Sequence, residues 1–282
     1  MDRTGTFHSL NGIRIIQSLP EPYEFDFNEL CHARAEQIID LNKKIYLLWS
    51  GGADSTLVFM LLEQAGITDE QLVVLVTSDS VSVNPVLDQY ITDHYEMDFP
   101  SLYTDKLRPF MEDGIILSGI GMDMLTTGFD VDHVETDDLS DLVNYLQRIS
   151  GGTSTEYQAI FDKLSKAAGL PCETVQQYSK LKNLILCWQP ELLQIGRLTG
   201  YGEYGQHYLN FYQTENFQRW SLSHSGFIKD RFGNKSVVSD LICSRQHEWL
   251  PKNRPRFTLP QLFTNRKTIR ITDDWRYFYD DT

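Results

Sequence analysis

Residues 45–62 read IYLLWSGGADSTLVFMLL, an apolar stretch interrupted once by a polar turn rich in glycine. Its first part, Ile45 to Trp49, is typical of a buried strand of a parallel sheet, and Ser55 to Leu62 predicts a buried helix. Gly51 and Gly52 lie at the junction, where glycine lets backbone amides converge on one anion at the positive end of a helix. We therefore expect a phosphate group to bind at this turn.

The flanking sequence predicts an α/β fold, a parallel sheet with helices on its faces. Residues 27–41 have the apolar spacing of an amphipathic helix, and residues 71–77 (QLVVLVT) and 114–117 (GIIL) are typical of two further buried strands. A helix over 85–95 is expected to begin at its proline. The turns after the first and third strands should lie at the carboxyl edge of the sheet, where such sheets bind ligands.

The chain divides by pattern into three regions. Residues 1–26 are expected to be a lead-in with at most one strand, at 13–16, and residues 27–150 are expected to form the α/β core. Residues 151–282 are predicted to be mainly helical, beginning with helical periodicity over 155–187. We expect this last region to complete the same domain.

Composition limits the classes of partner. The formal net charge is −14, and Lys and Arg cluster only around 252–270, so an extended nucleic-acid surface is not expected. No stretch has the length of a membrane span or the pattern of a signal peptide, which predicts a cytoplasmic protein without a membrane partner. The four cysteines form no C-x-x-C pair, so neither a zinc knuckle nor a catalytic dithiol is expected.

An acidic stretch, residues 130–141 (DVDHVETDDLSD), offers clustered carboxylates. Hard cations bind such oxygens, but charge-rich stretches usually face water. We expect a solvated loop that ends in the capped first turn of a helix, with a metal site as the alternative.

The turn at residues 50–55 (SGGADS) carries a family resemblance. It has neither the lysine of the G-x-x-x-x-G-K-[ST] loop nor a G-x-G-x-x-G pattern. It resembles the S-G-G-x-D-S signature of the PP-loop ATP pyrophosphatases, which cleave ATP between its α and β phosphates. The alternative is a Gly-Gly turn that opens an ordinary helix, with Ser50 as cap and Asp54 favoured by the helix dipole.

A second turn narrows the resemblance. Residues 117–123 (LSGIGMD), with Gly128, resemble the L-S-G-E-G-x-D-E segment of asparagine synthetases. Residues 216–224 and the segment 235–257 are similar to later strips of that family, though weakly. The resemblance implies the adenine nucleotide alpha hydrolase-like PP-loop fold, with ATP and Mg²⁺ as ligands.

The resemblance also implies roles for individual residues. Asp54 and Asp123 would hold Mg²⁺ and act in catalysis, and Arg256 and Lys235 would be the catalytic cations. The residues implied to contact the nucleotide are Leu48, Ser50, Gly51, Gly52, Asp54, Ser55, Thr56, Val76, Thr77, Ser78, Ser118 and Gly119.

The implied activity is that of an ATP-dependent, AMP-forming ligase. It would adenylate a carboxylate or amide-like carbonyl of a small-molecule substrate for attack by a nitrogen nucleophile. Ile120 and Met124 stand where asparagine synthetases have glutamates, which weakens the prediction of that exact reaction. Because no glutaminase domain is expected, the amine or ammonia would come from a separate donor protein. Two alternatives remain: an ATP-binding module that has lost turnover, and a nucleobase-modifying PP-loop enzyme, which the acidic charge and scattered cysteines disfavour.

Overall fold

The computed structural model describes residues 22–24, 26–76, 78–98, 104–126, 134, 137–187, 207–224, 236–249, 270, 271, 277 and 278. The predicted strand at 13–16 and residues 130–133, 135 and 136 of the acidic stretch lie outside this part of the chain.

Helices and strands alternate through the first half of the chain, and helices dominate the second. In chain order the elements are α1 (Phe27–Ile39), β1 (Ile45–Leu48), α2 (Ala53–Gln64), β2 (Leu72–Leu75), α3 (Ser78–Val83), α4 (Pro85–His94), β3 (Glu96–Asp98), α5 (Thr104–Asp113), β4 (Ile115–Ser118), α6 (Met122–Leu125), α7 (Leu139–Ser150), α8 (Ser154–Ala168), α9 (Val175–Lys182), the π-helix η3 (Asn183–Cys187), β5 (Tyr208–Asn210), α11 (Glu215–Ser223), α12 (Ser236–Gln246), the 3₁₀-helix η5 (His247–Trp249), β6 (Arg270–Ile271) and β7 (Tyr277–Phe278).

Local side-chain chemistry explains where several helices begin. The Asp26 side chain accepts a hydrogen bond from the Glu29 amide and caps α1. Asn84 caps α4, and Pro85 occupies the first turn, as predicted. Thr153 and Glu156 form a capping box at the start of α8.

The described end of the acidic stretch also serves as a cap. The Asp138 side chain accepts a hydrogen bond of 2.8 Å from the Ser140 amide at the start of α7. The Asp137 side chain accepts one of 2.9 Å from the Gln176 amide, which joins this turn to α9. The prediction of a capped helix start is therefore confirmed at Asp138.

Five strands form one sheet in the order β3-β2-β1-β4-β5, and all four pairings are parallel. The expected α/β fold is thus confirmed. The strands after β1 are added on one side as β2 and β3 and on the other as β4 and β5. The order therefore reverses between β1 and β4, which is the position where open parallel sheets bind ligands.

Three of these strands were expected and two were not. β1 and β2 lie within the predicted segments, and β4 overlaps the third but ends one residue later, at Ser118. By contrast, β3 and β5 are three-residue strands at the two edges of the sheet. The prediction of a mainly helical second half missed β5, which pairs with β4 from Ile116–Tyr208 to Ser118–Asn210. It also missed the short antiparallel ladder of β6 and β7.

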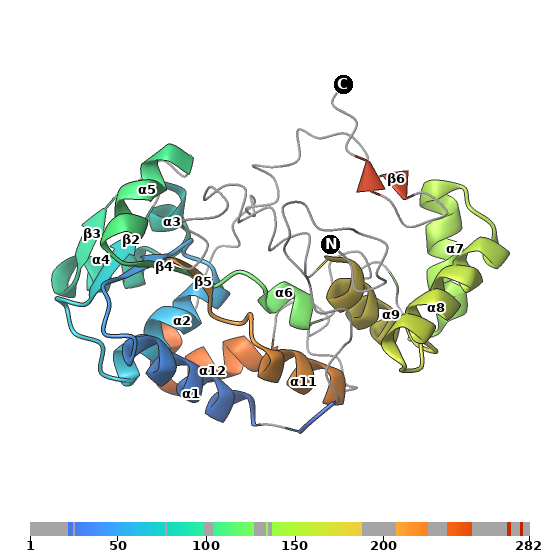
Figure 1. The fold of residues 1–282 in the computed structure, drawn as a ribbon, viewed down its shortest axis with the longest axis horizontal. Coiled ribbons are helices and arrows are strands. Elements are labelled where there is room, and N and C mark those ends of the chain that lie inside the picture. Colours follow the sequence, from blue (N-terminus) through green and yellow to red (C-terminus); the bar gives the residue numbers. More distant parts are fainter. Residues whose placement is uncertain are drawn as a thin grey trace.

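Helices cover both faces of the sheet. Ile45 and Leu47 lie in the main core with α1 and α2, and Tyr46 lies on the opposite face in a smaller core with α5. Figure 1 shows α1, α2, α11 and α12 grouped on one side of the sheet, with α5 on the other. Phe211, Trp220 and Ile242 belong to the main core, so the second half of the chain packs directly on the first.

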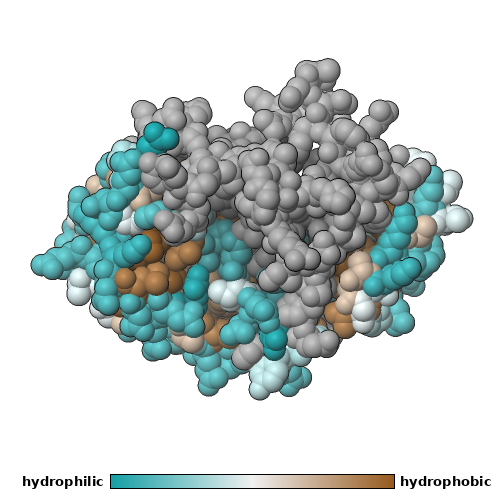
Figure 2. All heavy atoms as spheres, viewed as in Figure 1, coloured by the Kyte–Doolittle hydropathy of each residue, from teal (hydrophilic) through white to brown (hydrophobic). Residues whose placement is uncertain are grey.

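Helices α7, α8 and α9 form a second packed group, away from the sheet in Figure 1. Leu142, Phe161 and Leu181 are among its buried residues. On the face shown in Figure 2, the described surface is mostly hydrophilic, as expected for helices that bury one side. Within the described ranges, no helix combines the length and hydropathy needed to cross a bilayer.

Candidate functional site

The two glycine-containing turns leave the sheet side by side. Leu48 at the end of β1 is paired with Ser118 at the end of β4, so both turns begin at the same level of the sheet. This level is its carboxyl edge, and β1 and β4 are the two strands between which the strand order reverses. The predicted phosphate turn and the predicted second turn therefore share the topological switch point.

The first turn is held in shape by its two serines. The hydroxyl oxygens of Ser50 and Ser55 lie 3.0 Å apart, and the Ser50 amide donates to Ser55 Oγ at 3.2 Å. The Gly52 amide donates to Ser50 Oγ, and Ser55 Oγ donates to the Gly52 carbonyl. Gly52 is the cap residue of α2 and provides no side-chain cap, so this buried, apolar helix begins at a turn made of backbone and hydroxyl groups.

Gly51 is required by the packing of this turn. Its φ is +75°, a conformation that favours glycine, and a Cβ atom there would lie 2.5 Å from the Ser80 carbonyl oxygen. It would also lie 2.9 Å from Val83 Cβ. Gly51 therefore allows α3 to pack against the turn.

Gly119 brings the second turn against the first. A Cβ atom at Gly119 would lie 3.0 Å from both the backbone nitrogen and Cα of Ser55, and 3.2 Å from the Asp54 carbonyl carbon. A side chain would fit here only if the two turns moved apart by a few tenths of an ångström. The second turn thus lies against the first turn of α2.

Asp54 and Asp123 occupy equivalent positions. Each is the second residue of the helix that follows its strand, α2 after β1 and α6 after β4. Both residues are half-buried, and Oδ1 of each is fully buried. A carboxylate in the first turn of a helix also interacts favourably with the helix dipole.

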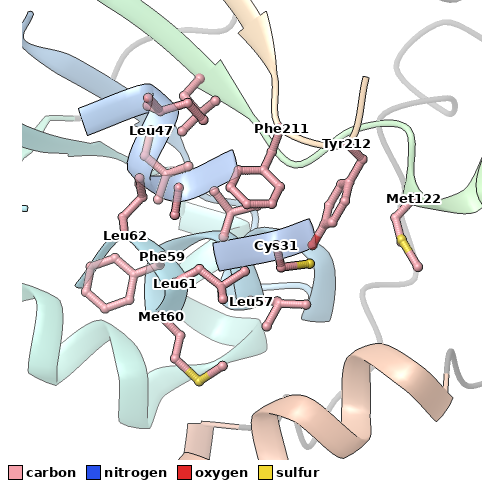
Figure 3. Packing of buried hydrophobic residues seen from close by; sticks show 14 of the residues in the cluster. Cys31, Leu47, Leu57, Phe59, Met60, Leu61, Leu62, Met122, Phe211 and Tyr212 are labelled. Atoms are coloured by element: carbon pink, nitrogen blue, oxygen red, sulfur yellow. The ribbon is translucent and has the colours of Figure 1, made fainter. Parts of the chain in front are cut away.

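Tyr212, which the sequence analysis did not single out, connects the two turns. Its hydroxyl donates a hydrogen bond of 3.2 Å to the Asp54 carbonyl, and its Cβ atom lies 4.0 Å from the position that a Cβ on Gly121 would take. Figure 3 shows the Tyr212 hydroxyl directed toward Cys31 and away from Met122. Burial raises the pKa of Tyr212 well above its ordinary value, so the hydroxyl keeps its proton and remains a donor.

The segment that carries Tyr212 is fixed from two further directions. The Phe211 amide donates to the Ser118 carbonyl at 2.8 Å, and Arg34 Nε donates to the Phe211 carbonyl at 3.2 Å. The exit of β5 is therefore a third segment of the site. No sequence motif marked it, because its contribution depends on pairing between β4 and β5.

Three of the predicted nucleotide-binding residues have polar groups engaged elsewhere. Thr56 is fully buried, and its hydroxyl accepts a hydrogen bond from Trp49 Nε1 at 3.3 Å. The Val76 amide donates to the Asp98 carbonyl within the sheet edge, and Ser118 Oγ accepts from the Ile120 amide at 3.0 Å. Thr56 and Ser118 therefore shape the fold around the turns with their hydroxyls, and the Val76 amide is used within the sheet.

The remaining predicted positions divide into two groups. Leu48 ends β1, and Ser78 begins α3 next to the first turn. Thr77, Lys235 and Arg256 lie outside the described residues.

The two apolar replacements in the second turn have different environments. Met124 is buried in the main core with 5% of its surface exposed, whereas Ile120 is only half-buried. Of the two, Ile120 alone is available to a ligand.

Within the described residues, no three His, Cys, Asp or Glu side chains are grouped so that they could hold a metal ion by themselves. A metal at Asp54 and Asp123 would thus take its other ligands from phosphate or water.

Neither models of known protein families nor curated proteins give a match to this chain. Function is accordingly inferred from the two turns and their geometry.

Proposed function

We propose that the chain is an ATP-dependent, AMP-forming ligase of the PP-loop type, resembling the synthetase domain of asparagine synthetases. The observation that carries the proposal is the contact of Gly119 with the first turn of α2 at the switch point between β1 and β4. Two motifs that the sequence places about seventy residues apart thereby lie in contact, which supports a shared site. A family resemblance at either motif alone would not require this contact.

The first turn fits the β and γ phosphates of ATP. Ser50, Gly52 and Ser55 surround the start of α2, where backbone amides and the helix dipole favour an anion. The hydroxyls of Ser50 and Ser55 now bond to each other, and a phosphate oxygen would replace these contacts without moving the backbone. Their part in the reaction is to hold the leaving pyrophosphate in line with the attacking group.

The two aspartates fit Mg²⁺, which prefers one or two carboxylates together with phosphate oxygens and water. Asp54 and Asp123 lie in the first turns of helices that start from adjacent strands, and no third acidic ligand is grouped with them among the described residues. When bound, the ion would offset the negative charge that develops on the leaving group. Asp54 and Asp123 would orient it, and the remainder of the coordination would come from the substrate.

The second turn indicates the kind of acceptor. Ile120 is the half-buried side chain at its tip, so the acceptor should present an apolar surface or an uncharged carbonyl there. A nitrogen nucleophile would then attack the adenylated carbonyl, supplied from a separate donor. The same residue favours the second candidate, an ATP-binding module without turnover, because no carboxylate at the tip of this turn can act on an amine.

Calorimetry with ATP in the presence and absence of Mg²⁺ tests nucleotide binding, and pyrophosphate release with a panel of carboxylate and amide metabolites tests turnover. Asp54→Ala should abolish the Mg²⁺-dependent part of the affinity. Asp69→Ala is a matched control, because Asp69 is exposed in the loop before β2, at the opposite edge of the sheet.

The outcomes separate the candidates. Mg²⁺-dependent ATP binding with pyrophosphate release supports the ligase. ATP binding without pyrophosphate release with every substrate tested supports the ATP-binding module without turnover. Unchanged ATP affinity in Asp54→Ala would show that this turn is not the nucleotide site.

A further inference from the structure

The helix that carries Asp123 cannot maintain its own geometry. α6 has only four residues, and a helix of one turn is unstable in water without tertiary contacts. Backbone hydrogen bonds at its two ends run from the Met124 amide to the Gly121 carbonyl and from the Thr126 amide to the Met122 carbonyl. The position of Asp123 thus depends on what holds the carbonyl end of α6.

Buried polar side chains donate hydrogen bonds to the carbonyls of Asp123, Leu125 and Thr126, at the carbonyl end of α6. Asn183 Nδ2 donates to the carbonyls of Asp123 and Thr126 at 3.4 and 3.3 Å. Ser221 Oγ donates to the Leu125 carbonyl at 2.5 Å. Asn183 and Ser221 are each at least 95% buried, so these bonds form without competition from water.

A lysine completes the network. Lys180 of α9 donates from Nζ to the Ser221 carbonyl at 2.9 Å, and it is the only charged side chain among the buried residues of the described ranges. Only 5% of its surface is exposed, and desolvation lowers its pKa to about 8. Burying an ammonium group is costly, whereas a methionine of similar length would fill the same space without that cost.

We propose that Lys180 is a positioning residue for Asp123, acting through Ser221 on the carbonyl end of α6. α9 and α11 are thereby linked by the Lys180–Ser221 hydrogen bond, and Ser221 in turn fixes Leu125. The positive charge of Lys180 also lies beside the carbonyl end of α11, where it interacts favourably with the helix dipole. This inference rests on the proposed function, since Asp123 matters as a ligand of the nucleotide-bound metal.

The experiment compares Lys180→Met and Ser221→Ala with Lys166→Met, an exposed lysine of the neighbouring α8. Amide hydrogen exchange at Met124 and Thr126, without nucleotide, measures how firmly α6 is held. Calorimetry measures ATP affinity with Mg²⁺ and with a chelator. Ser221→Ala removes one hydroxyl only, so it keeps the test decisive if Lys180→Met does not fold.

In both network variants, Lys180→Met and Ser221→Ala, the amides of Met124 and Thr126 should exchange faster than in the unmodified protein. Their Mg²⁺-dependent ATP affinity should fall about tenfold, a typical loss when a residue that orients a metal ligand is removed. Affinity in chelator should stay within about twofold, because Asp123 then has no metal to hold. Lys166→Met should match the unmodified protein in every measurement.

Unchanged exchange at these amides in both network variants would overturn the inference, as would equal affinity losses with and without Mg²⁺. If the unmodified protein binds no ATP, the proposed function fails, whereas the exchange comparison still decides whether Lys180 holds α6.

Discussion

Tyr212 donates a hydrogen bond of 3.2 Å from its hydroxyl to the carbonyl of Asp54, which lies 158 residues earlier in the chain. The bond joins the exit of β5 to the first turn of α2, the turn expected to face the phosphates. Tyr212 is fully buried in the main core, so removal of its hydroxyl is a sensitive probe of the site.

Tyr212→Phe removes the hydroxyl and keeps the ring. We expect the free energy of unfolding to fall by about 1 kcal/mol, the usual net value of a buried hydrogen bond. ATP affinity should also fall several-fold, because Asp54 loses a contact that fixes its backbone. Urea unfolding and calorimetry measure the two effects.

Tyr157→Phe is the matched control for this change. The Tyr157 hydroxyl also donates to a carbonyl, that of Leu146 at 3.1 Å, but within the group formed by α7, α8 and α9. It should cost similar stability and leave ATP affinity unchanged. Equal losses of affinity in both variants would mean that Tyr212 acts only through overall stability.

Gly119→Ala tests the contact between the two turns. The added Cβ would meet the backbone of Ser55 at 3.0 Å, so the turns must move apart. We expect a loss of about 1–3 kcal/mol in stability, as for overpacking of a tight interior, and a clear loss of ATP affinity. Gly114→Ala creates a clash with the Lys44 carbonyl at the other end of β4. That variant should lose stability and, measured while folded, bind ATP normally.

The sequence predicts the centre of the sheet and not its edges. β1, β2 and β4 are buried on both sides and read as continuous apolar runs, which are recognisable without the structure. β3 (EMD) and β5 (YLN) have three residues each, too few for a periodic pattern, and only pairing with a neighbour makes them strands.

The site shows the same division. The two turns follow predicted strands and carry local motifs, so both could be found by reading the sequence. Tyr212, Lys180 and Ser221 act across long sequence separations, and a lysine in a helix is usually interpreted as a surface residue. Their roles follow from packing, which periodicity does not encode.

Burial of Lys180 predicts a pH-dependent stability. Its pKa is about 8 in the folded protein, against 10.5 for an ordinary lysine. Between these values the unfolded chain binds more protons, so this group makes stability rise with pH over that range and leaves it constant below about 8. The full change corresponds to about 3 kcal/mol.

Urea unfolding of the unmodified protein and Lys180→Met at several pH values from about 7 to 10.5 measures this term as a difference, because other groups titrate alike in both proteins. The free energy of unfolding of the unmodified protein should increase relative to that of Lys180→Met as the pH rises. The difference from Lys166→Met should stay constant. If the difference in unfolding free energy between the unmodified protein and Lys180→Met were also constant with pH, Lys180 would have an ordinary pKa.

The last prediction concerns Ile120, at the tip of the second turn. Its amide donates to Ser118 Oγ, so the backbone of the turn is fixed, and its half-buried side chain presents an apolar surface. Such a surface can neither remove a proton from an amine nor attract a cationic one. We therefore expect purified protein with ATP, Mg²⁺, aspartate and ammonia to make no appreciable asparagine, which chromatography measures against a known asparagine synthetase.

Ile120→Glu completes the test. Because the side chain lies at the tip of the turn and the ATP contacts are assigned to the first turn, this change should leave ATP affinity unaltered in calorimetry. A large loss of affinity would place Ile120 against the nucleotide instead of the acceptor. Robust asparagine formation by the unmodified chain would show that a glutamate at this position is dispensable for amidation, and the acceptor would then be aspartate despite the apolar turn.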